Sequence, residues 1–148
     1  MTTSTRPTYE TDFAAWAFSQ ADLLRQERFE ALDLENLIEE LETLGRSEYR
    51  AFESALTRLT QHLLKWQYQA DKRSKSWLST IREQRRQIAK LLRDNPSFKA
   101  RLAEAIAEGY SDGRGDAAFE TDLPLASFPE QCPYTWDQLT KVDWLPEG

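Results

Sequence analysis

The sequence predicts a nearly all-α fold, a small antiparallel bundle of four to five main helices. An irregular C-terminal tail, rich in proline and aromatic residues, is expected to pack on this bundle. Apolar residues recur at helical spacing over most of the chain, and no segment alternates polar and apolar residues as a strand does. The 148 residues are 40% hydrophobic and 30% charged, which is typical of a globular protein. We expect residues 1–8 to be a disordered lead and residues 9–148 to form a single helical domain.

The first two helices are predicted from capping residues followed by apolar periodicity. Asp12 can accept hydrogen bonds from the free N–H groups of a helix over residues 12–27, and Asp33 can begin the next one. Gly45 interrupts the second apolar stripe. Because glycine costs about 1 kcal/mol relative to alanine inside a helix, two alternatives are open: one helix over residues 33–67, or two helices bent at Gly45. A continuous helix would span roughly 50 Å, so a kink or a packed partner chain is expected.

The third helix has clear start and stop signals. Residues 68–74 are predicted to connect it to the second helix, and Ser74 or Ser76 can cap its first turn. The pair Asn95-Pro96 ends it, because proline disfavours the α conformation in the residue before it. A fourth helix is predicted to follow this proline.

The fourth helix and the tail have different characters. Gly109 and Gly113 in the helix fit either a close helix crossing or fraying better than phosphate binding, since no strand precedes them. From Leu123 onward, prolines and scattered aromatic residues replace the helical period. Large apolar side chains are costly to leave in water, so the tail is predicted to pack on the bundle. Thr135 is expected to cap one helical turn over Trp136–Lys141.

Charge is distributed unevenly along the chain, whose net charge is −6. Residues 1–60 hold 6 Lys/Arg and 12 Asp/Glu, residues 61–101 hold 11 and 3, and residues 102–148 hold 2 and 10. Either the acidic helices neutralise the basic one inside the fold, or the basic segment binds a phosphate-rich partner. We favour neutralisation, because an acidic protein is a poor non-specific binder of nucleic acid.

A polar cluster is predicted between the second and third helices. The apolar stripe of the third helix needs a member at position 84 or 85, and both Gln84 and Arg85 are polar. A buried polar group needs partners, and carboxylates of the second helix share one face there. The candidate polar centre comprises Glu35, Glu39, Glu42, His62, Arg82, Gln84 and Arg85. We favour a structural network, and the alternative is a polar ligand pocket between helices.

A basic face is predicted on residues 72–93, where cations recur at helical spacing: Arg73, Lys75, Arg82, Arg86, Lys90 and Arg93. Trp66, Tyr68 and Trp77 could offer stacking surfaces to nucleic-acid bases. The favoured interpretation is a solvated face with internal salt bridges.

No metal or cofactor site is predicted. A di-metal carboxylate bundle usually needs two Glu-x-x-His pairs, and the chain has none. His62, the only histidine, is expected to be a half-buried packing residue with one hydrogen bond. Cys132 cannot form an internal disulfide, which fits a reducing compartment, and it is expected to be inert. With no transmembrane run and no signal peptide, we expect a cytoplasmic protein.

Several blocks of sequence together resemble a known family. They include Tyr9-Glu10-Thr11-Asp12-Phe13, Leu32-Asp33-Leu34-Glu35-Asn36-Leu37-Ile38-Glu39-Glu40-Leu41-Glu42, His62-Leu63-Leu64-Lys65-Trp66-Gln67-Tyr68-Gln69 and Ile81-Arg82-Glu83-Gln84-Arg85. In these blocks the chain is similar to the bacterial family called domain of unknown function 29, over about Tyr9 to Pro146. The resemblance implies a small all-α bundle and a bacterial origin. It implies no reaction and no catalytic residue.

Three functions follow as hypotheses. The first is a non-enzymatic protein-interaction or regulatory module, an acidic bundle that pairs with itself or with another bacterial protein. The second is nucleic-acid binding or processing through the basic helix. The third is an enzyme with a polar interhelical site, which would use Glu39, His62 and Arg82. The long amphipathic helix, the aromatic tail and the lack of catalytic motifs favour the first.

Overall fold

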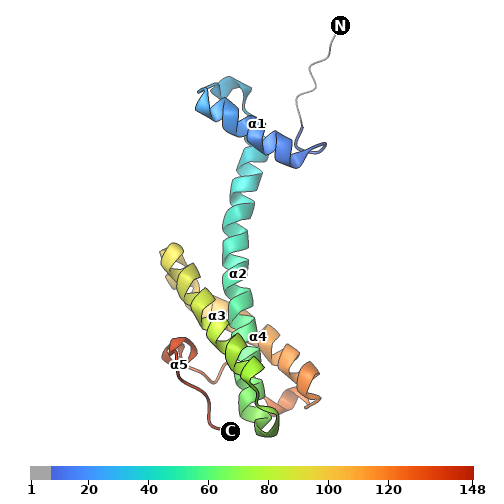
Figure 1. The fold of residues 1–148 in the computed structure, drawn as a ribbon, viewed down its shortest axis with the longest axis vertical. Coiled ribbons are helices and arrows are strands. Elements are labelled where there is room, and N and C mark those ends of the chain that lie inside the picture. Colours follow the sequence, from blue (N-terminus) through green and yellow to red (C-terminus); the bar gives the residue numbers. More distant parts are fainter. Residues whose placement is uncertain (1–7) are drawn as a thin grey trace. The chain divides into compact units, whose positions relative to one another are not determined.

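The structure, a computed structural model, describes residues 8–148, in which the regular secondary structure is helical (Figure 1). The α-helices are α1 (Phe13–Arg25), α2 (Leu34–Tyr68), α3 (Lys75–Asp94), α4 (Leu102–Thr121) and α5 (Trp136–Thr140). Short 3-10 helices lie at Phe29–Ala31, Ala70–Lys72, Pro96–Arg101 and Leu125–Ser127. Because residues 8–148 contain no strand and four main helices, the predicted all-α class is confirmed. The predicted disordered lead falls almost entirely outside the described residues.

The chain divides into two compact units, Met1–Arg46 and Ser47–Gly148. We call them unit 1 and unit 2 and describe each by itself. The boundary falls next to Gly45, inside α2, yet α2 is one unbroken helix of 35 residues. Of the two alternatives at Gly45, the continuous helix is therefore confirmed. The single domain over residues 9–148 stays a prediction.

In unit 1, side-chain hydrogen bonds hold α1 against the start of α2. Asp12 caps α1 as predicted, with its carboxylate accepting a hydrogen bond from Ala15 N at 3.1 Å. Buried Trp16 donates its indole N–H to Asp33 Oδ2 at 3.0 Å, and buried Gln20 accepts from the backbone N–H of Asp33 at 2.8 Å. The Asn36 amide and the Trp16 indole lower the pKa of the Asp33 carboxyl, so it stays ionised at this junction.

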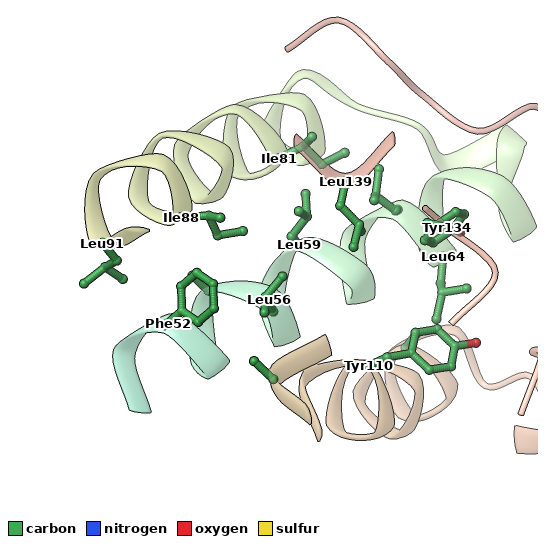
Figure 2. Packing of buried hydrophobic residues seen from close by; sticks show 14 of the residues in the cluster. Phe52, Leu56, Leu59, Leu64, Ile81, Ile88, Leu91, Tyr110, Tyr134 and Leu139 are labelled. Atoms are coloured by element: carbon green, nitrogen blue, oxygen red, sulfur yellow. The ribbon is translucent and has the colours of Figure 1, made fainter. Parts of the chain in front are cut away.

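In unit 2, the second half of α2 is the central element of the core. Its apolar residues that are fully shielded from water are Phe52, Leu56, Leu59, Leu63 and Leu64. Helix α3 runs back along this half of α2 and adds Ile81, Ile88 and Leu91, as Figure 2 shows. Ser74 caps α3 as predicted by accepting a hydrogen bond from Trp77 N at 3.3 Å. Asn95 follows the last helical residue, so the predicted stop is also confirmed.

Helix α4 crosses α2 at very short range through two glycines. A Cβ atom added at Gly109 would lie 2.8 Å from Leu56 Cβ, and one at Gly113 would lie 2.7 Å from the Thr57 carbonyl oxygen. Both distances are below van der Waals contact, so only glycine fits these positions without displacing the backbone. Of the two alternatives for these glycines, a close helix crossing and fraying, the crossing is confirmed.

The tail packs on unit 2, as predicted. Phe128, Tyr134 and Leu139 are buried in the same core as α2, α3 and α4. Figure 2 shows Tyr134 and Leu139 in this core. Thr135 forms a complete capping box with Gln138 at the start of α5. Among the described helices, none combines the length and the apolar character that crossing a bilayer would require.

Candidate interaction surfaces

Arg85 is the buried charge that fastens the tail to α3. Only 6% of the residue is exposed. Its Nε donates to Leu139 O at 2.9 Å, and its Nη1 donates to Val142 O at 3.2 Å. Its Nη2 donates to Gln138 O at 3.0 Å and to Trp144 O at 2.8 Å. One guanidinium therefore satisfies four backbone carbonyls at and beyond the end of α5.

The prediction that a polar residue of α3 faces inward is confirmed by Arg85, while Gln84 is half-buried. The expected partners were wrong, because Arg85 bonds carbonyls of the tail and no carboxylate. The carboxylates expected to pair with it belong to unit 1: Glu35, Glu39 and Glu42. The planar fork of donors suits several carbonyls gathered at a helix C-terminus, which itself attracts positive charge. Burial lowers the pKa of Arg85, and Asp143 opposes that shift.

His62 is a half-buried packing residue, as expected. Its Nδ1 lies 2.8 Å from the Arg58 carbonyl oxygen. Burial lowers the pKa of His62 below its usual 6.5, and the charges that act on it come from Lys65, Glu120 and Arg58. Arg82, which the enzyme hypothesis places beside His62, is exposed on α3 and is not among these groups. Glu39, the third residue of that hypothesis, belongs to unit 1.

Metal binding and thiol chemistry find little support in residues 8–148. Within residues 8–148, no three His, Cys, Asp or Glu side chains gather in a way that could hold a metal ion. Burial raises the pKa of the half-buried Cys132 thiol, so little of it is the reactive thiolate at neutral pH.

The basic face lies in solvent, and few of its charges are neutralised. All its members are exposed: Arg73, Lys75, Arg82, Arg86, Lys90 and Arg93. Arg86 pairs with Glu83 of the same helix at 2.8 Å, and Arg73 stacks over Trp66 at 4.8 Å. Within residues 8–148, the other four members form no ion pair, so the expected salt bridges from this face to neighbouring helices are absent there.

The aromatic residues expected to stack nucleic-acid bases are engaged inside unit 2. Tyr68 packs edge-on against Phe128, with ring centroids 5.0 Å apart. Trp77 lies under the ammonium group of Lys65, at 4.7 Å from the ring centroid. Trp66 is covered by Arg73. The three aromatic residues predicted to stack bases are therefore already in contact with other side chains of unit 2.

Unit 1 presents a row of exposed apolar side chains on the first half of α2. Leu34, Ile38, Leu41 and Leu44 are 59%, 54%, 67% and 64% exposed, and we call them the docking stripe. They recur at spacings of four and three, so they share one helical face. Exposed carboxylates follow three of them by one position: Glu35, Glu39 and Glu42. The sequence predicted this apolar face but gave no sign that it stays uncovered.

Unit 2 has a hollow between α3 and the tail that the sequence did not predict. A cavity of about 470 Å³ is lined by the apolar side chains of Leu92 and Trp136 and by the exposed cations Arg93 and Lys99. A second cavity of about 190 Å³ shares lining residues with it and reaches Arg82. We call the two cavities the basic groove. Its tail wall is Trp136, Thr140 and Val142, about fifty residues beyond α3 in the sequence, where no local pattern indicates the contact.

Comparison with known proteins gives one finding at the level of the family. A family model described as a domain of unknown function, DUF29, matches residues 8–145, which is nearly the whole chain. No curated protein and no solved structure matches the chain. The resemblance seen in the sequence blocks is thereby confirmed over almost the same span. The chain belongs to the DUF29 family.

Proposed function

We propose that this protein is a non-enzymatic interaction module whose docking stripe binds a basic amphipathic helix of a protein partner. The observation that carries the proposal is the exposure of four large aliphatic side chains in one row on α2. Single apolar residues on a surface are ordinary, but a contiguous row bordered by charge is typical of helix docking.

The stripe offers enough apolar surface to drive association. Burying an aliphatic side chain completely is worth about 1.5–3 kcal/mol, and more than half of each of these four is exposed. Covering the row would therefore supply roughly 4–6 kcal/mol before the entropic cost of association. The apolar face that the partner helix buries in the same contact adds a similar gain, and the two together can exceed the lower end of the entropic cost and give a weak, reversible complex.

The charge around the stripe selects the partner. Residues 8–46 hold ten Asp/Glu and three Lys/Arg. Arg46 approaches Glu39 at 3.6 Å and Glu42 at 3.5 Å, but both pairs are exposed and so only weakly held. A partner helix with acidic flanks would be repelled. A helix flanked by Lys or Arg would instead form ion pairs with the carboxylates beside the stripe.

Nucleic-acid binding through the basic face is the second candidate, favoured by cations that lack ion pairs within residues 8–148. The engaged aromatic residues and the net charge of −6 weigh against it. We therefore place protein binding first.

The test uses labelled synthetic helices of about three heptads, with leucine on one face and either lysine or glutamate flanking it. Fluorescence anisotropy is expected to show binding of the lysine-flanked helix only. Changing Leu41 and Leu44 together to serine should weaken that binding by about 2 kcal/mol, or roughly 30-fold.

The matched control is Phe119→Ser, because Phe119 is a single exposed apolar residue of unit 2, at 85%. It should leave the affinity unchanged. Equal binding of both helices, or equal loss in the control and the stripe variant, would refute the docking stripe.

A further inference from the structure

The basic groove of unit 2 combines an apolar lining with positive charge, whereas the docking stripe of unit 1 is apolar and bordered by negative charge. Its apolar lining, with Leu92 and Trp136, can accept aliphatic side chains. The exposed cations that line it are Arg82, Arg86, Arg93 and Lys99. No carboxylate of residues 8–148 lines either cavity. The groove therefore suits an apolar ligand that carries negative charge along its edge.

Most of these cations are available for an intermolecular contact. Within residues 8–148, Arg82, Arg93 and Lys99 make no ion pair, and Arg86 has only its exposed neighbour Glu83. Arg85, the buried guanidinium of the groove, is already committed to the tail carbonyls. It fixes the tail as the opposite wall, so the groove is built before any ligand arrives.

The docking stripe matches this groove in pattern. Its aliphatic row would face the apolar lining, and Glu39 and Glu42, each next to a stripe residue, would approach the cationic rim. A helix with apolar residues along one face and carboxylates at its edge is the expected guest of a groove with an apolar floor and a basic rim.

We propose that the partner of the docking stripe is a second copy of this chain, which receives the stripe in its basic groove. This inference rests on the proposed function and names its partner. Complementary charge is the argument for a second copy, since one chain carries both the acidic stripe and the basic groove. Stripe against stripe would bring carboxylates together and is disfavoured. Stripe against groove pairs opposite charges at a heterologous contact.

Charge reversal in two separate variants tests the pairing. One variant carries Glu39→Lys and Glu42→Lys, and the other carries Arg82→Glu and Arg93→Glu. Sedimentation equilibrium at low salt is expected to show a mass above one chain for the native protein. Each variant alone should self-associate about 10-fold more weakly, because like charges then face each other. An equimolar mixture should regain the native affinity, since each reversed surface meets its complement.

The control variant Lys72→Glu with Lys75→Glu makes the same charge change outside both cavities and should associate as the native chain does. Circular dichroism checks that all variants keep their helix content. The mixture separates the proposal from misfolding, because damaged chains would not restore each other. A mass of one chain at every concentration, or no recovery in the mixture, would overturn the pairing.

Two parallel measurements identify the cause of a failure. If the native chain stays monomeric but binds the lysine-flanked helix, self-pairing is wrong and the proposed function stands. If it binds neither a second copy nor that helix, both are wrong. If a monomeric chain binds single-stranded DNA and the Arg82→Glu, Arg93→Glu variant does not, the groove takes nucleic acid and the pairing is overturned.

Discussion

Replacing Arg85 should release the tail from unit 2. Its guanidinium donates four hydrogen bonds, of 2.8 to 3.2 Å, to tail carbonyls. Each such bond contributes about 1 kcal/mol net, and a carbonyl left buried without a donor adds a further cost. Water can reach part of the site, because three of the four bonds are only partly buried. We therefore expect Arg85→Met to lower the free energy of unfolding by about 3 kcal/mol.

Arg85→Lys is a useful second variant, because it keeps the positive charge but loses the planar set of guanidinium donors. One ammonium group has three donors at a single point and cannot reach four separate carbonyls. We expect a loss of about 2 kcal/mol.

Urea unfolding followed by circular dichroism gives both free energies. Trp136 and Trp144 are two of the five tryptophans, so release of the tail should appear as a partial change in tryptophan fluorescence at lower urea than the helix signal in the Met variant. A loss below about 1 kcal/mol for Met, with unchanged tail fluorescence, would refute the fastening role of Arg85.

Three further changes test the fold. Gly113→Ala should destabilise unit 2 by about 1–3 kcal/mol, measured by urea unfolding, since its Cβ would lie 2.7 Å from the Thr57 carbonyl oxygen. Gly45→Ala should raise the melting temperature and add about 0.5–1 kcal/mol, because nothing lies within 4 Å of its Cβ position and alanine favours the helix. Because the pKa of His62 is lower in the folded chain than in the unfolded chain, the unfolded chain binds the His62 proton first as the pH falls. The contribution of His62 to the free energy of unfolding is therefore full above pH 6.5 and is lost on acidification. Unfolding at pH 7.5 and 5.5 should therefore show a smaller acid loss in His62→Gln than in the native chain.

Local signals were predictable from the sequence because their causes lie within a few residues. Asp12, Ser74 and Thr135 cap helices by bonding N–H groups three positions ahead, so the residue type and its position suffice. The glycines of α4 predicted a close crossing or fraying without deciding between them, because the choice depends on which element packs against the helix.

The contacts of Arg85 were not predictable, although the burial of a polar residue at position 84 or 85 was. Its partners lie 53 to 59 residues away in a segment without periodicity, so nothing near Arg85 identifies them. The prediction paired Arg85 with a carboxylate of the preceding helix because it considered opposite charge alone. Backbone carbonyls of an irregular tail were not considered as partners.

The two proposed surfaces show the same limit. Periodicity indicates which side of α2 is apolar, but not whether another element covers it, and Leu41 proves to be 67% exposed. The groove exists only because Trp136 and Thr140 meet α3 after folding. Exposure and concavity are properties of the packed chain and leave no trace in local sequence.

Amide hydrogen exchange at increasing protein concentration tests the central claim most directly, because it reports the docking stripe and the basic groove in one experiment. Pairing between copies predicts that protection rises together in residues 34–46, in residues 82–93 and in residues 136–144, and that salt reverses the rise. Exchange in residues 34–46 that is independent of concentration, in a chain whose unit 2 remains folded, would contradict the account.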